Sequence, residues 1–190
     1  MKRITIFASG TGTNARAILQ HFRHNPQVKV EAIICNKPTA KVIEVAQEFQ
    51  VPYYLISKKD LYETTHVLDL LKSSATDLIV LAGFLWMIPE NILMSFPKRI
   101  INIHPALLPL HGGPGMYGRK VHEAVLQSSD KETGITIHYL NEKYDEGEII
   151  AQHRIAVEAT DTPESVAANV HALEHEWYPK VIEELLSRQS

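Results

Sequence analysis

The chain has 190 residues, of which 45% are hydrophobic and 22% are charged, and its formal net charge is −3 at pH 7. This length predicts a single domain that can bury a substantial core. The sequence lacks an apolar run of the ~20 residues that a membrane helix needs and lacks a basic block, so we expect neither a membrane nor a nucleic-acid partner. A single cysteine, Cys35, in an apolar run predicts a buried thiol in a reducing compartment, here the cytoplasm.

Strand-like and helix-like segments alternate along the first part of the chain. Short apolar runs predict strands at residues 4–8, 30–35, 53–56, 78–82 and 100–104. The segments between them predict helices at about residues 14–24, 40–49, 60–73 and 89–95. This alternation is typical of βαβ units, so we expect a doubly wound, Rossmann-like α/β fold with right-handed crossovers.

The pattern changes after residue 105. A loop rich in Gly and Pro reaches residue 118, a helix is predicted at about 119–128, and strands are predicted at 133–140 and 148–157. The short turn at 141–147 indicates a C-terminal antiparallel hairpin, hence a mixed but mostly parallel sheet. Capping residues before Pro163 open a long terminal helix to about residue 187, which Pro179 should kink or interrupt.

A glycine-rich loop, Ser9-Gly10-Thr11-Gly12-Thr13-Asn14, follows the first predicted strand and precedes the first helix. Free amides and the helix dipole at such a turn favour an anion, and phosphate is the natural ligand. The loop also fits the dinucleotide fingerprint, but the second strand ends in Cys35-Asn36-Lys37 and offers no acidic residue for a ribose hydroxyl. The dinucleotide interpretation is weakened but stays open, as does a tight turn that binds nothing.

Three polar residues form a candidate catalytic group. Asn102 and His104 are two apart in a predicted buried strand and should share a face, while Ile101 and Ile103 pack behind it. Pro105 should end the strand and leave His104 at its carboxyl end, where open α/β sheets bind ligands. With Asp145 from a later turn, these residues supply an amide donor, an acid/base and a carboxylate.

This group suits acyl transfer. It contains no activated serine or cysteine, so direct attack by a substrate amine is favoured over a covalent acyl-enzyme. A histidine that is merely hydrogen-bonded at a strand end is the alternative interpretation of His104.

A possible zinc motif lies in the terminal helix. His171-Ala172-Leu173-Glu174-His175 fits the pattern H-x-x-E-H, but the sequence offers no clear third ligand, so we expect no metal. An amphipathic helix with one polar side explains the spacing better.

Taken in chain order, these motifs resemble the phosphoribosylglycinamide formyltransferase family of the formyltetrahydrofolate transferase and hydrolase group. The resemblance covers nearly all of the chain and rests on six segments: Ser9–Asn14, Leu81-Ala82-Gly83-Phe84, Asn102-Ile103-His104-Pro105-Ala106-Leu107-Leu108-Pro109, Gly134-Ile135-Thr136-Ile137-His138-Tyr139, Asp145-Glu146-Gly147 and Glu174-His175-x-x-Tyr178-Pro179.

The resemblance implies transfer of a formyl group from 10-formyltetrahydrofolate, as co-substrate, to the amine of glycinamide ribonucleotide in purine biosynthesis. It implies one formyltransferase domain over residues 1–190, with a phosphate-binding half at about 1–98 and a folate-binding and catalytic part at about 99–190. It also implies small-molecule substrates, no metal, and a monomer or homodimer.

The resemblance also assigns residues. Asn102, His104 and Asp145 would be catalytic. The nucleotide would be bound by Gly12, Thr13, Asn14, His171 and Glu174. The folate would be bound by Leu85, Trp86, Met87, Ile88, Asn102, Asn141, Glu142, Lys143, Tyr144 and Asp145.

Four competing functions stay open from the sequence. Methionyl-tRNA formyltransferase and formyltetrahydrofolate deformylase share the central motifs but normally carry a further domain. A nucleotide-binding module without catalysis would explain only the glycine loop. A zinc peptidase would explain only the motif at His171.

Overall fold

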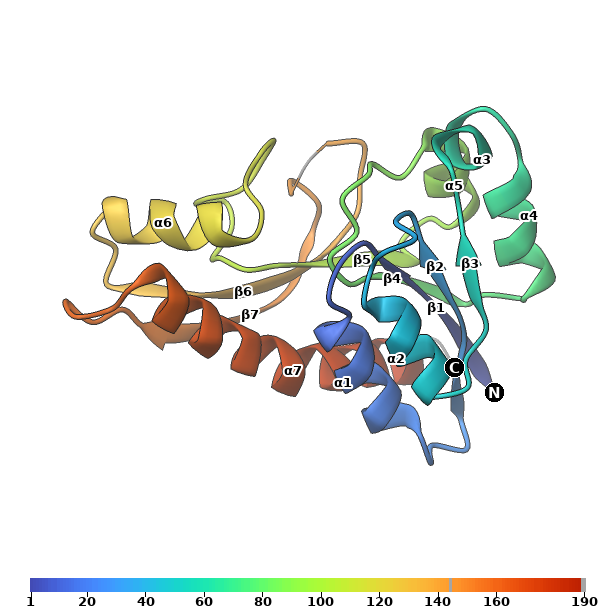
Figure 1. Cartoon of the computed structure of the whole chain (residues 1–190), viewed down its shortest axis with the longest axis horizontal. Coiled ribbons are helices and arrows are strands. Elements are labelled where there is room, and N and C mark those ends of the chain that lie inside the picture. The colour runs from blue at the N-terminus through green and yellow to red at the C-terminus, as the bar shows by residue number, and fades with distance from the viewer. Residues whose placement is uncertain (144, 189–190) are drawn as a thin grey trace.

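The structure, a computed structural model, describes residues 1–143 and 145–188. Within them, seven strands form one sheet in the order β3-β2-β1-β4-β5-β6-β7 (Figure 1). The strands are β1 (Lys2–Ala8), β2 (Val28–Cys35), β3 (Tyr53–Leu55), β4 (Leu78–Leu81), β5 (Ile100–His104), β6 (Glu132–Tyr139) and β7 (Ile149–Ala156). The helices are α1 (Thr13–Phe22), α2 (Val42–Glu48), α3 (Lys58–Tyr62), α4 (His66–Ser73), α5 (Glu90–Ser95), α6 (Arg119–Gln127) and α7 (Pro163–Arg188).

The sheet is mixed, as predicted. Strands β1 to β5 pair in parallel, whereas β6 is antiparallel to both β5 and β7. The predicted C-terminal hairpin is therefore confirmed. Parallel strands need crossover connections, and the helices between β1 and β5 supply them.

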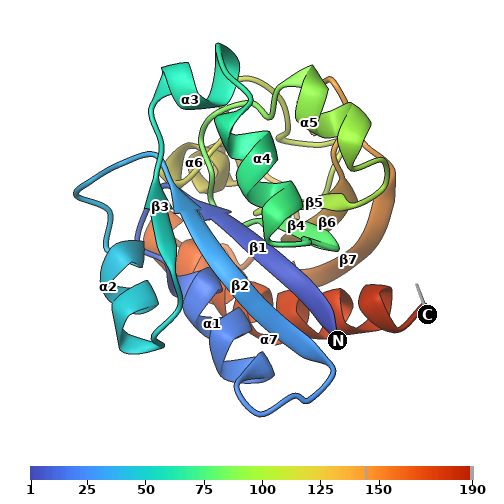
Figure 2. The same cartoon turned by 90° about the vertical axis from the view of Figure 1, so that its right-hand side faces the viewer.

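Helices cover both faces of the sheet (Figure 2). One core contains side chains of α1, α2 and α7, and the other contains side chains of α3, α4 and α5. Adjacent residues of β1 point to opposite cores: Ile6 belongs to the first core and Phe7 to the second, and both are fully buried. A strand covered on both faces has no polar side, which explains its continuous apolar run.

The predicted helix at residues 60–73 consists of two helices, α3 and α4. Ser57 and Asp60 form a capping box that starts α3. The Thr64 hydroxyl donates to the Asp60 carbonyl at 3.1 Å and accepts from the His66 amide at 3.2 Å. Threonine side chains that bond the local backbone compete with helical hydrogen bonds, so the helix breaks between Tyr62 and His66.

The terminal helix α7 runs without interruption through Pro179. Tyr178, next to that proline, is fully buried, and its hydroxyl donates to the Leu81 carbonyl of β4 at 2.9 Å and reaches the Ile101 carbonyl of β5 at 3.4 Å. Burial raises the pKa of Tyr178 well above its ordinary value, so the hydroxyl stays protonated and remains a donor. These hydrogen bonds connect α7 to strands β4 and β5. None of the described helices combines the length and apolar character of a membrane span.

We expect Tyr178→Phe to lower the free energy of unfolding by about 1–2 kcal/mol, because it removes the hydroxyl from buried strand carbonyls while keeping the ring. Urea denaturation measures the change. Tyr53→Phe, at an exposed position of β3, is the matched control and should leave stability unchanged. Equal free energies of unfolding for the two variants would show that the Tyr178 hydroxyl does not stabilise the packing of α7 on the sheet.

Candidate functional site

A cleft of about 440 Å³ opens where the strand order reverses between β1 and β4. The loop after β1 lies beside the loop after β4: the Ser9 amide donates to the Gly83 carbonyl at 3.1 Å, and the Leu85 amide donates to the Ser9 hydroxyl at 3.0 Å. Ligands of open α/β sheets bind at such a reversal, outside the carboxyl ends of the strands. The cleft therefore occupies the expected position for a substrate site.

The glycine loop forms one wall of the cleft and leads into α1. Gly12, the residue before the helix, has φ +77°, and a Cβ there would lie 2.8 Å from the Val42 Cα. Only glycine fits such a position without strain. No side chain caps this end of α1, so its first amides are free for an anionic ligand.

The cleft joins the loop to α7. Asn14 Nδ2 donates to Glu174 Oε2 at 2.9 Å, although the two residues are 160 positions apart. Burial raises the pKa of Glu174, and the Asn14 hydrogen bond opposes that rise only in part. His171, one turn earlier on α7, lines the same cleft. The predicted nucleotide-binding residues are thus brought together.

Asn102, His104 and Asp145 also meet in this cleft. His104 Nδ1 lies 3.5 Å from Asp145 Oδ2, and the Gly113 amide donates to the same oxygen at 3.0 Å. Burial acts to raise the pKa of Asp145, but the neighbouring His138 and His104 and the hydrogen bond from the Gly113 amide outweigh it and hold that pKa below its ordinary value. Asp145 is therefore ionised. Ile101 and Ile103 pack in one core behind the site, as predicted.

His104 is nearly buried, and both its ring nitrogens face acceptors. Its Nε2 lies 2.8 Å from the His111 carbonyl, and its Nδ1 faces Asp145. Burial lowers the pKa of His104 below its ordinary value, and Asp145 and the His111 carbonyl oppose that shift only in part. Occupation of the cleft by a ligand that develops negative charge would favour the protonated form.

His138 is a site residue that the sequence interpretation did not assign. It pairs with Asn102 across β5 and β6, and its Nδ1 must carry hydrogen because it faces the Tyr139 carbonyl at 3.0 Å. Its Nε2 then accepts from Asn102 Nδ2 at 3.3 Å and lies 3.6 Å from Asp145 Oδ1. His138 therefore orients the Asn102 amide. The alternation of apolar and polar residues in β6 was the available signal.

His122 is a second residue that the sequence interpretation missed. It lies on α6, lines the cleft and is 2% exposed, yet its Nδ1 has no hydrogen-bond partner. Burial lowers the pKa of His122, and the neighbouring His171 and His104 lower it further. The ring is therefore neutral near pH 7.

The residues assigned to folate are more dispersed. Leu85 lines the cleft, whereas the Ile88 side chain is buried in the second core, which leaves only its backbone for a ligand. Trp86 packs against Phe84, with ring centroids 6.2 Å apart. The exposed Met87 accepts a hydrogen bond from the Tyr62 hydroxyl through its carbonyl.

The second folate segment lines a separate groove of about 520 Å³. Asn141, Glu142 and Lys143 border this groove together with Leu93 and Met94. The remaining assigned residue, Tyr144, lies outside the described residues. Its assignment, like the others to folate, stays a prediction.

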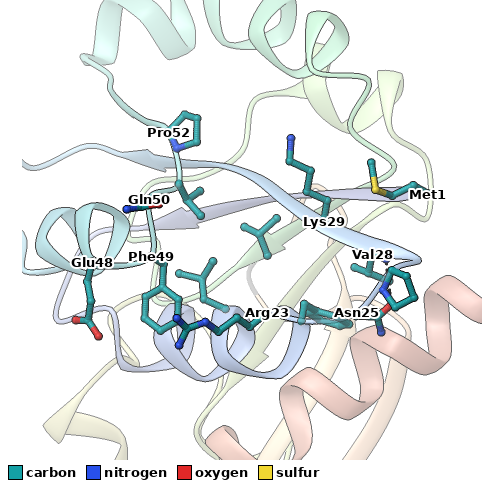
Figure 3. A pocket seen from close by; sticks show the side chains of 14 residues that line it. Met1, Arg23, Asn25, Val28, Lys29, Glu48, Phe49, Gln50 and Pro52 are labelled. Atoms are coloured by element: carbon teal, nitrogen blue, oxygen red, sulfur yellow. Dashed lines mark hydrogen bonds between the residues drawn. The ribbon is translucent and has the colours of Figure 1, made fainter.

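Two alternatives to the cleft, a metal site and a second hollow, have weaker support as functional sites. Among the described residues, no group of three or more His, Cys, Asp or Glu side chains could hold a metal ion. A larger hollow of about 820 Å³ lies at the start of β1 and β2, at the opposite end of β1 from the glycine loop (Figure 3). Its labelled charged side chains are Arg23, Lys29 and Glu48, and it contains none of the residues assigned to catalysis.

Comparison with known proteins gives a consistent result. The formyl transferase family model matches residues 2–182. Phosphoribosylglycinamide formyltransferase of Bacillus subtilis (strain 168) is 38% identical and is covered over 95% of its length, with 98% of this chain covered. The chloroplastic enzyme of Arabidopsis thaliana is 40% identical over 95% of this chain, which spans only 64% of that relative.

Solved structures agree with the sequence relatives. The crystal structure of phosphoribosylglycinamide formyltransferase from Bacillus halodurans has a TM-score of 0.87 and 36% identity, covering 100% of this chain and 97% of the other. That of glycinamide ribonucleotide transformylase 1 from Geobacillus kaustophilus has a TM-score of 0.88 and 35% identity, covering 98% and 99%.

The buried histidines predict loss of stability in mild acid. Below the ordinary histidine pKa of about 6.5, the unfolded chain binds a proton that folded His122 takes up only at lower pH. The free energy of unfolding should therefore fall from about pH 7 to about pH 5, and His122→Gln should reduce that slope. The raised pKa of Glu174 changes the free energy of unfolding with pH in the opposite direction, and it does so equally in the wild type and in His122→Gln. Urea denaturation at several pH values measures the slopes, and equal slopes would contradict the role of His122.

Proposed function

The chain belongs to the formyl transferase family, and from this premise we propose that it transfers a formyl group from 10-formyltetrahydrofolate to the amine of N1-(5-phosphoribosyl)glycinamide in purine biosynthesis. The observation that carries the proposal is a single cleft that holds both an anion-binding loop and the group Asn102, His104 and Asp145. A nucleotide-binding module would need only the loop.

The phosphate of the nucleotide would bind at the start of α1. Amides of the glycine loop and the α1 dipole supply the attraction, and Thr13 and Asn14 add side-chain donors. Glu174 and His171, on α7, would contact the ribose and the remainder of the same substrate. The Asn14–Glu174 hydrogen bond supports this arrangement, because it joins the phosphate loop to the carboxylate.

The folate would approach from the side of the β4 loop and the turn after β6. Leu85 and Asp145 line the cleft, and Asn141, Glu142 and Lys143 border the separate groove of about 520 Å³. The side chains of Leu85 and Met87 are exposed beside this approach, and the resemblance adds Trp86, Met87, Ile88 and Tyr144 to this set. The formyl group would then lie near Asn102 and His104.

The chemistry is a direct displacement at the formyl carbon. The substrate amine attacks, a new C–N bond forms, and the carbonyl electrons move to oxygen to give a tetrahedral oxyanion. The Asn102 amide donates to this oxyanion, a contribution worth about 3–4 kcal/mol, and the positive charge of protonated His104 stabilises it further. When the oxygen electrons return, the bond to the folate nitrogen breaks.

Asp145 would support the charge of His104 during this step. The pair also provides a route for the proton that leaves the attacking amine and is required by the departing folate nitrogen. The depressed pKa of Asp145 supports this role, since an ionised carboxylate stabilises an adjacent imidazolium. No covalent intermediate with the protein is needed.

We expect His104→Ala and Asp145→Asn each to lower kcat by about 100-fold or more, with the KM of the nucleotide nearly unchanged, because these groups act in the transition state. A spectrophotometric formyl-transfer assay with glycinamide ribonucleotide measures both constants. His24→Ala, at an exposed position after α1, is the control.

The same assay with water and with methionyl-tRNA as acceptors separates this function from the related ones. Turnover with either acceptor but not with glycinamide ribonucleotide would contradict the proposal. Unchanged turnover in both His104→Ala and Asp145→Asn would contradict the assigned roles.

The phosphate site predicts the opposite kinetic pattern. Thr13→Val and Asn14→Ala should raise the KM of the nucleotide about tenfold, the cost of about 1.4 kcal/mol of lost binding, while kcat changes little. Titration with the dephosphorylated nucleoside is the comparison, and its binding should be insensitive to Thr13→Val. An equal effect on both ligands would place the phosphate elsewhere.

A further inference from the structure

The loop after β5 contacts both members of the His104–Asp145 pair. His111 accepts the Nε2 hydrogen of His104 through its carbonyl at 2.8 Å. Two residues later, the Gly113 amide donates to Asp145 Oδ2 at 3.0 Å. A short segment of main chain therefore borders the acid/base group on two sides, and its placement matters for the geometry of that group.

A side-chain contact holds this segment. His111 Nε2 lies 2.6 Å from Asp130 Oδ2, and that oxygen also accepts from the Ser128 hydroxyl at 2.7 Å. The His111 side chain is 14% exposed and that of Asp130 is 31% exposed. The contact is therefore short and partly shielded from water.

His111 also has an unfavourable backbone conformation. Its φ is +54°, in the left-handed region that non-glycine residues rarely adopt. Such a conformation persists only where surrounding contacts hold it. The contact with Asp130 is the one that the structure provides for the His111 side chain, and the same conformation directs the His111 carbonyl at His104.

The carbonyl decides which nitrogen of His104 is reactive. A carbonyl oxygen only accepts, so the nitrogen that faces it must carry hydrogen in every protonation state. Nε2 is thereby fixed as the protonated nitrogen, and Nδ1, which faces Asp145 at 3.5 Å, is left to take up and release a proton.

We propose that Asp130 and His111 are positioning residues: Asp130 holds His111, and the His111 carbonyl fixes the His104 ring with its Nδ1 towards Asp145. The kinetic consequence rests on the proposed formyl transfer, whereas the positioning itself does not. Neither residue needs to touch substrate. His111 and Asp130, at the two ends of the segment 111–130, together hold the His104 ring in place.

Nuclear magnetic resonance of the His104 ring tests the proposal without turnover. The nitrogen signals of the wild type should show hydrogen on Nε2 in the neutral ring. In Asp130→Ala the midpoint of the His104 titration should fall by about one pH unit, because the carbonyl that favours the protonated ring is released. Asp130→Asn keeps an oxygen acceptor for His111 and should lie close to the wild type.

The matched control is Glu183→Gln. Glu183 pairs with His21 Nε2 at 2.8 Å, which is the same kind of contact, between α7 and α1 and outside the cleft lining. It should leave the His104 titration unchanged. His111→Ala and the double variant His111→Ala/Asp130→Ala should match Asp130→Ala, since residues that act through one contact are not additive.

The rate measurement gives a second readout. In Asp130→Ala the imidazolium form of His104 is lost at a lower pH, so the alkaline limb of the pH profile of kcat should move to lower pH. At pH values above the shifted limb, kcat should be about tenfold lower than in the wild type, with the KM of the nucleotide unchanged. An unmoved His104 titration, hydrogen on Nδ1 in the wild type, or a higher kcat in Asp130→Ala would overturn the proposal. If the wild-type protein showed no formyl transfer in the assay, the proposed function would be overturned. The titration of the His104 ring would still test the positioning role of Asp130 and His111.

Discussion

The parallel alignment of β1, β4 and β5 is the constraint on which the site depends. Backbone hydrogen bonds hold these strands side by side, so their carboxyl ends lie at one edge of the sheet. The glycine loop, the loop at Leu85 and His104 leave from that edge. Tyr178 adds a cross-connection, because its hydroxyl bonds to carbonyls of β4 and β5 and brings α7, with Glu174, to the same place. A shift of any of these strands would separate the glycine loop from Asn102 and His104.

The second constraint is low water access around charged groups. His104, His138 and Glu174 are all nearly buried, and each has a hydrogen-bond partner that decides its orientation. In such surroundings charge interactions are stronger than in water, so small changes in the position of Asp145 alter the protonation of His104. The cleft is thus ordered by polar contacts and not by apolar packing alone. This favours a site that stabilises developing charge.

Formyl transfer and the positioning of His104 are connected through the segment between β5 and α6. The glycines of this segment allow sharp changes of direction, and His111 adopts a left-handed conformation among them. Its side chain contacts Asp130, which follows the C-terminal end of α6. The segment therefore connects the turn after α6 to the imidazole of His104.

The order of residues was enough to predict the class of fold and most of the residues that line the cleft. Apolar runs and their spacing predicted every strand and the mixed sheet, because burial of both faces of a parallel sheet leaves a clear pattern. The glycine loop and the spacing of Asn102 and His104 likewise follow from local backbone rules. The break between α3 and α4 was missed, since threonine hydroxyls compete with helical bonds only in a particular local geometry.

Tertiary structure alone decided which distant side chains became partners. The pairing of Asn14 with Glu174, of His138 with Asn102 and of His111 with Asp130 depends on strand order and on the path of α6 and α7. The burial of His122 has the same origin. Local propensity carries no information on contacts between remote segments, because they arise only when the sheet brings the carboxyl ends of its strands to one edge.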